Sequence, residues 1–384
     1  MITERPDRQV LVVGDSVVGL ALTLLLQNAG YDPLIVSGTA PPVSSRVTYL
    51  CPPVVRTFDA LGVDTSVRDC GTTVESVSVD VSSSQNKPTV LSMDSDQAET
   101  PPLVVRTACL RRALDAQLPE QQHGGDRTVE TLSRRDGGLV VEFGDGIREW
   151  FDAVVDTGGG DALRPTGVEA PASEPLAQYE TGLDTDSLTR DGIRDYWRSD
   201  ALVQAFQSPT GSGSVLRVTA PPSDVDRVLD EVNWETVLRN GTDVVSGEGE
   251  SERTSVRQVR LSDAAADWWG IGRMAFCGRA ACPVAPATGF DVALGIEDAV
   301  AFVTELAEAT RDVSDIVDTY SSRRAERLAT LRETVETADF DHRYPIPRST
   351  RPPLVSLGAF RAVTLGSFLG APMEHLQRKG FKAT

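Results

Sequence analysis

RQVLVVGDSVVGLALTLLLQNAGYDPLIVS, residues Arg8–Ser37, is the stretch that decides the fold. It opens with a short β-branched apolar run, passes a glycine and continues into a long apolar segment that a second glycine closes. This order is typical of a strand, a tight turn, a helix and a second strand. The predicted pieces are the strand Gln9–Val13, the turn at Gly14, the helix Val17–Ala29 stopped by Gly30, and the strand Leu34–Val36.

The predicted unit has the form that opens a dinucleotide-binding sheet. A helix N-terminus offers unpaired N–H groups and a partial positive charge to a diphosphate. Gly14 allows the tight turn, and Gly19 lets the helix approach the strand closely. Two positions depart from the usual fingerprint, because Ser16 stands where glycine is expected and Ser37 stands where an acid binds a ribose hydroxyl. A strand–helix–strand unit that binds no nucleotide therefore stays an alternative.

The chain has 384 residues, a length that suits one large domain or two intertwined lobes. Its formal net charge is −19, and nearly all of its basic residues are arginine. An acidic surface repels the phosphates of nucleic acids, so we expect no nucleic-acid partner. Such a surface stays hydrated in concentrated salt, where screening weakens its self-repulsion, so the charge indicates a halophilic habitat.

The five cysteines are odd in number and lack the spacing of metal ligands, so we expect no metal site. The N-terminal sequence MITERPDRQV has no signal-peptide pattern, and no apolar run is long enough for a membrane helix. These features predict a cytoplasmic protein whose cysteines are buried, reduced thiols.

The rest of the chain alternates between helical and strand patterns. We expect helices at Pro52–Leu61, Val104–Leu118, Asp191–Trp197, Ser223–Arg239, Val292–Thr310 and Ser314–Thr337, the last with Ser314 as N-cap. We expect strands at Val74–Val81, Thr89–Leu91, Thr128–Leu132, Leu139–Phe143, Trp150–Val155, Gln178–Gly182, Ser214–Thr219, Thr254–Leu261 and Met274–Cys277. The strands within 171–262 predict a second, mainly antiparallel sheet.

The predicted fold class is α/β, with a Rossmann-like dinucleotide-binding domain intertwined with a mainly antiparallel β-sheet domain. We assign 1–73, 98–170 and 263–345 to the first domain, 74–97 and 171–262 to the second, and 346–384 to a C-terminal helical tail. The apolar positions of Pro353–Phe368 favour a docking helix or a homodimer contact through the C-terminal helices. A membrane-surface role is the least favoured, because the chain is acidic and only Arg361 flanks these positions.

Two further stretches carry a resemblance to a known family. Arg273–Ala299 reads RMAFCGRAACPVAPATGFDVALGIEDA, a strand, a glycine turn, a proline-rich loop and a helix. Phe151–Arg164 reads FDAVVDTGGGDALR, a strand that runs into a glycine turn. With Arg8–Ser37 and Val104–Leu118, they make the chain resemble the FAD-dependent aromatic-ring hydroxylases, flavoprotein monooxygenases of the p-hydroxybenzoate hydroxylase type.

The resemblance implies an FAD-type Rossmann-like domain, a substrate sheet at 171–262, FAD as cofactor and NAD(P)H as reductant. Hydroxylation then belongs to the cofactor, so no catalytic side chain is assigned. The positions that match the family's cofactor contacts are Gly14, Ser16, Val17, Gly19, Ser37, Arg106, Gly278, Arg279, Pro286 and Gly289. Weaker candidates for a substrate pocket are Arg46, Thr48 and Tyr49.

Several departures from the family fall on ligand contacts. Arg279 replaces an aspartate, Cys282 replaces a histidine, and Gly158 stands where a Gly-Ala-Asp-Gly turn has its acid. Asp291, where the family has glycine, either places a carboxylate beside the flavin or turns outward and caps the helix Val292–Thr310.

Two hypotheses from different classes remain open. The first is an FAD-dependent oxidoreductase of the monooxygenase type that acts on an apolar or aromatic small molecule. The alternative is a protein that keeps the scaffold, has lost FAD and serves as a binding or interaction module. An NAD(P) enzyme without flavin is disfavoured, because Ser37 offers neither an acid nor a cation to the adenosine ribose.

Overall fold

The computed structural model describes residues 9–38, 47–81, 89–92, 100–135, 137–158, 163, 173–183, 192–197, 201–209, 213–231, 251–259, 269–281, 290–308, 312–337, 340–341 and 346–347. Apart from the short strand β20 (Ile346–Pro347), the predicted C-terminal tail lies outside this part of the chain, so its docking or dimer role stays a prediction.

A five-stranded sheet in the order β17-β18-β11-β1-β2 forms the first lobe, which we call the Rossmann-like lobe. Its strands are β1 (Gln9–Val13), β2 (Asp32–Val36), β11 (Ala153–Asp156), β17 (Gly270–Ile271) and β18 (Met274–Phe276). β1 pairs in parallel with β2 on one side and with β11 on the other, so the carboxyl ends of these three strands meet at one edge. The predicted α/β fold class is confirmed.

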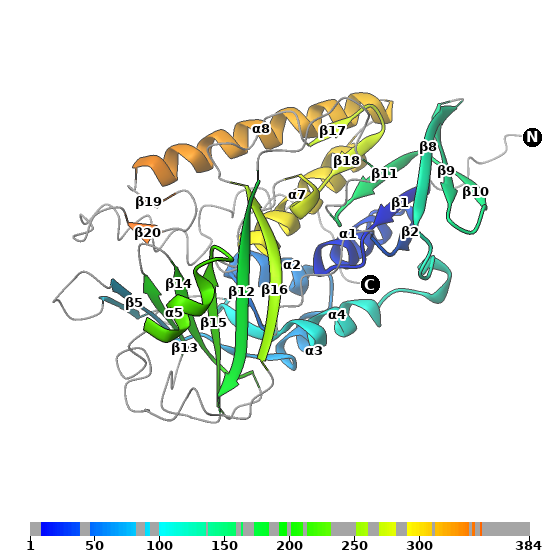
Figure 1. Ribbon diagram of the computed structural model, residues 1–384. Coiled ribbons are helices and arrows are strands. Elements are labelled where there is room, and N and C mark those ends of the chain that lie inside the picture. The colour runs from blue at the N-terminus through cyan, green and yellow to red at the C-terminus, as the bar shows by residue number, and fades with distance from the viewer. Residues whose placement is uncertain are drawn as a thin grey trace, which may run out of the picture.

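Helices lie beside this sheet (Figure 1). α1 (Val17–Asn28) connects β1 to β2, and its residues Val17 to Leu26 are all buried. It packs against α4 (Thr107–Asp115) and α7 (Phe290–Glu308). α8 (Val313–Thr337) packs on α7 and runs from beside β17 to beside β19 (Phe340–Asp341).

The second lobe is a seven-stranded sheet in the order β16-β12-β15-β14-β13-β5-β6. Its strands are β5 (Ser76–Val81), β6 (Thr89–Ser92), β12 (Ser173–Leu183), β13 (Gly192–Trp197), β14 (Leu202–Gln207), β15 (Ser214–Ala220) and β16 (Ser251–Val259). All neighbouring strands are antiparallel except β13 and β5, which are parallel. The predicted mainly antiparallel sheet is therefore present.

The remaining elements form smaller units. β3 (Val47–Leu50), β7 (Leu103–Arg106) and β4 (Gly71–Thr73) make one three-stranded sheet, and β10 (Arg148–Phe151), β9 (Gly138–Phe143) and β8 (Val129–Arg135) make another. β19 and β20 pair antiparallel. Short helices are α2 (Pro52–Ala60), α3 (Asp64–Arg68), α5 (Val225–Glu231), η1 (Glu120–Gln122) and η3 (Gly278–Ala280).

The two faces of the large sheet have different neighbours. On one face, Val218 and Leu216 pack with Val225 and Val228 of α5 in a small separate core. The opposite face contributes its apolar side chains to the main core, at Ile193, Leu202, Phe206 and Val215. This second face therefore looks toward the Rossmann-like lobe.

Three secondary-structure predictions were wrong. The predicted helix Asp191–Trp197 is strand β13 over Gly192–Trp197, because this segment pairs with β14 on one side and with β5 on the other. The predicted helix Val104–Leu118 begins later, since the β-branched run before Thr107 forms strand β7. The predicted strand Trp150–Val155 is split at Asp152. The Asp152 N–H donates to the Gln9 carbonyl and the Asp152 carboxylate accepts from the Gln9 N–H, so the chain begins a new pairing in the main sheet there.

The predicted N-cap of α8, Ser314, is replaced by Asp312, which lies two residues earlier. α8 begins at Val313, and the Asp312 carboxylate accepts hydrogen bonds from both the N–H (2.9 Å) and the hydroxyl (2.6 Å) of Ser314. These bonds hold the pKa of the Asp312 carboxyl below its usual range.

The expectation of five free thiols is corrected by a disulfide between Cys70 and Cys109. Cys51 and Cys277 are buried free cysteines, as expected, whereas Cys282 lies outside the described residues. No helix in the part of the chain that the structure describes is long and apolar enough to cross a bilayer.

A buried ion cluster joins α7 to α8. Glu297 and Asp298 on α7 are fully buried, and Arg324 on α8 contacts both, at 2.6 Å from Glu297 Oε1 and 2.6 Å from Asp298 Oδ1. Arg327 lies 2.9 Å from Glu297 Oε1. Burial raises the pKa of the Asp298 carboxyl to about 6, although Arg324 acts in the opposite direction.

We expect Asp298 to make part of the stability pH-dependent. Its pKa is higher in the folded than in the unfolded chain, so the folded state binds more protons between about pH 4 and 6. The free energy of unfolding of the wild type, relative to that of Asp298→Asn, should therefore fall as the pH rises through this window. The expected slope is up to about 1.4 kcal/mol per pH unit. Urea unfolding of both proteins from pH 4 to 8 measures this, and a constant difference would contradict it.

A second buried ion pair ties the large sheet to β3. Arg217 Nε lies 2.5 Å from Glu180 Oε1, and Arg217 Nη2 donates to the Val47 carbonyl at 2.5 Å. Gln178 Nε2 donates to the same Glu180 oxygen at 2.9 Å. Both charged side chains are at most 3 % exposed, so each depends on the other for charge compensation.

Removing one partner of this pair should cost more than removing both. Arg217→Met leaves the Glu180 carboxylate buried without its cation, for which we expect a loss of about 3–5 kcal/mol in the free energy of unfolding. Adding Glu180→Gln should recover a substantial part of that loss. Denaturant unfolding of the two single variants and the double variant gives the coupling energy, and additive losses would rule out a compensated pair.

Candidate functional site

The N-terminus of α1 offers main-chain N–H groups at the carboxyl end of β1. Ser16 is its N-cap, and the hydroxyl oxygen accepts a hydrogen bond from the Gly19 N–H at 3.3 Å. The first main-chain bond runs from the Leu20 N–H to the Ser16 carbonyl at 2.9 Å. The N–H groups of Val17 and Val18 precede that bond, where a helix leaves its donors for other acceptors. With the helix dipole they make a position suited to an anion.

Three glycines meet beside this helix end, and we call Gly14, Gly38 and Gly158 the glycine cradle. They follow β1, β2 and β11. A Cβ at Gly14 would lie 2.8 Å from the Gly158 nitrogen, and a Cβ at Gly38 would lie 3.2 Å from the Gly14 Cα. Gly14 also has a φ of +111°, which favours glycine. The strand ends thus meet main chain to main chain.

Thr157 fastens the cradle from the β11 side, a role that the sequence did not reveal. Its hydroxyl lies 3.1 Å from the Val13 carbonyl and 3.0 Å from the Gly14 carbonyl, and its side chain is 1 % exposed. Asp156 Oδ1 accepts a hydrogen bond from the Gly158 N–H at 2.8 Å. The turn after β11, where Gly158 stands in place of an acid, is therefore held by the Thr157 hydroxyl and the Asp156 carboxylate.

Gly19 is required by the packing of the same turn. A Cβ there would lie 1.8 Å from the Gly14 carbonyl oxygen and 2.8 Å from Thr157 Oγ1. The expectation that Gly19 permits a close approach of helix and strand is confirmed.

Arg111 reaches the same turn from α4 and was not among the predicted site residues. Its Nη2 lies 2.7 Å from Asp15 Oδ2, and its Nε donates to the Asp15 carbonyl at 3.0 Å. Asp15 stands between Gly14 and Ser16, so this ion pair fixes the main chain of the turn directly. The sequence signal was an acid in a glycine turn, but nothing local indicated its partner.

The described residues fit the diphosphate of a dinucleotide. Unsubstituted main chain meets at the ends of parallel strands, and the amides of Val17 and Val18 would face the negative charge. The part of the site that would face the adenosine ribose offers fewer polar contacts. Ser37 follows β2 in place of an acid, and its N–H donates to the Gly125 carbonyl at 3.4 Å. FAD would therefore be held here mainly through its diphosphate.

The late glycine turn lies between two helices of this lobe. Gly278 has a φ of +58°, and its N–H donates to Asp298 Oδ2 at 2.7 Å. A Cβ on Gly278 would be 3.3 Å from the Gly295 Cα and 3.5 Å from Val18 Cγ1. Arg279 follows in η3 and is partly buried. The cofactor roles of Gly278 and Arg279 stay predictions.

The other predicted site residues are scattered around this centre. Arg106 is the exposed N-cap of α4. Thr48 and Tyr49 are buried on β3, and the Thr48 hydroxyl lies 2.7 Å from that of Thr107. Arg46, Pro286 and Gly289 lie outside the described residues.

Asp291 does not take the capping position that one interpretation gave it. α7 begins at Phe290, so Asp291 stands inside the first turn of the helix.

The Glu180–Arg217 pair brings the substrate-pocket candidates of β3 next to the large sheet. Arg217 donates to the carbonyl of Val47, the residue before Thr48. Its guanidinium also lies 4.7 Å from the centre of the Phe206 ring. This part of the sheet is a mixture of apolar side chains and a neutralised charge. Among the described residues, no group of three or more His, Cys, Asp or Glu is placed to hold a metal.

The similarity of the chain to known proteins lies in its fold. The sequence model of a family described as "FAD binding domain" matches residues 202–335, which is less than half of the chain. No curated protein matches the sequence.

Solved structures show the same fold at low sequence identity. Klebsiella pneumoniae HpxO complexed with FAD and uric acid has a TM-score of 0.70 at 15 % identity, with 96 % of this chain and 97 % of that chain covered. CtdE in complex with FAD and a substrate has a TM-score of 0.70 at 17 % identity, with 97 % and 98 % covered.

The 2,6-dihydroxypyridine-3-hydroxylase of Arthrobacter nicotinovorans has a TM-score of 0.67 at 14 % identity, with 91 % of this chain and 96 % of that chain covered. The resemblance that the sequence motifs indicated is thus confirmed: along nearly its whole length, the chain has the fold of the FAD-dependent hydroxylases and monooxygenases.

Proposed function

We propose that the protein is an FAD-dependent oxidoreductase of the monooxygenase type that acts on an apolar or aromatic small molecule. The observation that carries the proposal is the glycine cradle beside the N-terminus of α1, where main chain from three strand ends comes into close approach. The match to an FAD binding domain and the fold shared with proteins solved with FAD support it.

FAD, when bound, would supply electron transfer from NAD(P)H and the chemistry with oxygen. The chain's own part is to bind and orient. The amides of Val17 and Val18 would hold the diphosphate, while Thr157 and the Arg111–Asp15 pair keep the turn in place.

The large sheet supports the proposed class of substrate. The side chains on its inner face include Phe206 and Val215, which belong to the main core. The one guanidinium described above, that of Arg217, is already compensated by Glu180. The balanced charge on this face favours an uncharged molecule over a carboxylate, because a carboxylate would disturb the pair.

The direct test is the visible absorbance of the purified protein, followed by titration with FAD in concentrated salt. We expect a flavin spectrum and saturable binding. A protein that is colourless and takes up no FAD at large excess would select the alternative, a scaffold that lost its cofactor and serves as a binding or interaction module.

Ser16 allows a sharper test of where the diphosphate binds. Asp and Asn are both good N-caps, so Ser16→Asp and Ser16→Asn should leave α1 intact. The carboxylate of Ser16→Asp would stand beside the diphosphate, where like charges about 4 Å apart repel by roughly 4 kcal/mol at an effective dielectric of about 20. We expect FAD affinity to fall by about a hundredfold or more in Ser16→Asp and to change far less in Ser16→Asn. Fluorescence titration measures both, and equal affinities would place the diphosphate elsewhere.

A further inference from the structure

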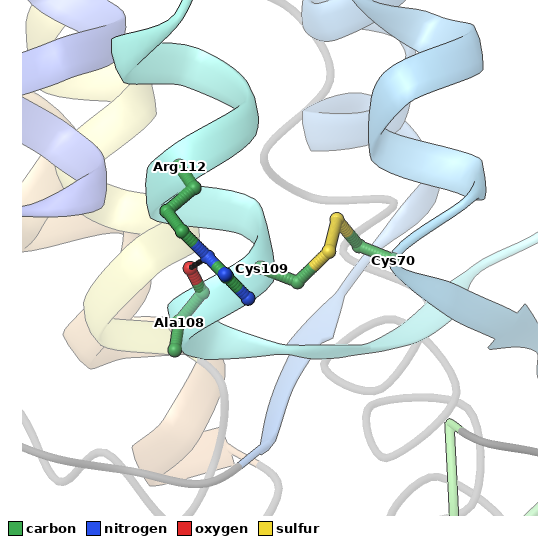
Figure 2. The surroundings of a disulfide bond; sticks show 4 residues. All are labelled: Cys70, Ala108, Cys109 and Arg112. Atoms are coloured by element: carbon green, nitrogen blue, oxygen red, sulfur yellow. Dashed lines mark hydrogen bonds between the residues drawn. A yellow bond between two sulfur atoms is a disulfide. The ribbon is translucent and has the colours of Figure 1, made fainter.

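The Cys70–Cys109 disulfide fixes the start of α4. Cys70 directly precedes β4, and Cys109 lies in the first turn of α4, so the bond joins the helix to a segment 39 residues earlier (Figure 2). Around it, the Arg106 N–H donates to the Cys70 carbonyl at 3.0 Å. The disulfide thus reinforces a junction between a small sheet and a helix.

The opposite side of α4 contacts the turn of residues 14–16 between β1 and α1, which we call the diphosphate turn after the group that the proposed function places there. Arg111 follows Cys109 by two residues, which is about 200° around a helix, so the two side chains leave in nearly opposite directions. Arg111 contacts both the carboxylate and the main-chain carbonyl of Asp15. α4 therefore stands between the disulfide on one side and the diphosphate turn on the other.

α4 needs such tethers because it is short. It has nine residues, of which Leu110 and Leu114 are the buried ones. A helix of this length has little stability of its own, and its position depends on tertiary contacts.

We propose that the Cys70–Cys109 disulfide is a redox-sensitive brace for the diphosphate turn. When the bond is closed, α4 presents Arg111 to Asp15 and the turn is ordered for FAD. When the bond is open, α4 is held less firmly and FAD binds more weakly. The ligand in this statement rests on the proposed function, whereas the effect on the turn does not.

A dithiol is the class of reductant that opens the bond. Its thiolate attacks Cys109, which is partly exposed, while Cys70 is 2 % exposed. The Cys70–Cys109 bond breaks, a mixed disulfide forms on Cys109, and the Cys70 thiolate takes up a proton. The second thiol of the reductant then releases Cys109 as a thiol and closes its own disulfide. Two electrons and two protons pass to the protein.

The first test compares FAD affinity in the oxidised protein and after treatment with dithiothreitol, with thiol titration to count the thiols released. We expect reduction to release two thiols and to weaken FAD binding by roughly threefold to tenfold. The Cys70→Ser/Cys109→Ser variant should have the weaker affinity under both conditions. An oxidised protein without the disulfide, or an affinity unchanged by its reduction, would overturn the proposal.

Variants of two adjacent arginines distinguish the proposed brace from a general loosening of α4. Arg111→Ala should bind FAD about as weakly as the reduced protein and respond little to dithiothreitol. Arg112→Ala is the matched control, because Arg112 is exposed and donates to the Ala108 carbonyl of its own helix (Figure 2). It should keep both the affinity and the response. Equal behaviour of the two variants would contradict the role of Arg111.

Hydrogen exchange in the protein without added FAD keeps this proposal distinct from the proposed function. We expect the amides of a peptide spanning Asp15–Gly19 to exchange several times faster after reduction or in Arg111→Ala. Faster exchange in a protein that never binds FAD would uphold the brace and refute the cofactor assignment. FAD binding with neither affinity nor exchange altered by reduction would uphold the cofactor and refute the brace.

Discussion

The whole Rossmann-like lobe depends on main chain approaching main chain at the carboxyl ends of three parallel strands. Gly14, Gly38 and Gly158 lie so close together that a Cβ on Gly14 or Gly38 would press on a neighbouring backbone atom. Gly19 lets α1 come against the same turn. Because these contacts leave no room for side chains, they set both the height of α1 above the sheet and the direction in which its free N–H groups point.

Two buried ion clusters fix the elements around that centre. Arg217 joins the large sheet to β3, and Arg324 joins α7 to α8. Arg217 faces one buried carboxylate and Arg324 faces two, and the loss of a partner leaves an uncompensated charge. Such clusters contribute more to the definition of the structure than to the free energy of unfolding, because the cost of desolvating the charges offsets much of their attraction. They hold residues that are distant in the sequence at a defined separation.

The sequence was sufficient for features whose signal is local. The unit from Gln9 to Val36 follows from apolar periodicity and two glycines, and the structure has it with nearly the same bounds. Features set by packing could not be predicted in this way. Gly192–Trp197 is a strand only because neighbouring strands pair with it. The Cys70–Cys109 bond and the Arg111–Asp15 pair each depend on where α4 docks, which no local pattern specifies.

Because the glycine cradle is made of bare backbone, its shape cannot be retuned by exchanging its own residues. Any adjustment of what it holds has to come from the surrounding ring, at positions such as Asp15, Ser16 and Thr157. This explains how the chain can lack an acid at Ser37 and still keep the shape of the site. Efforts to redirect the protein toward another ligand should accordingly alter that ring and leave the strand ends untouched.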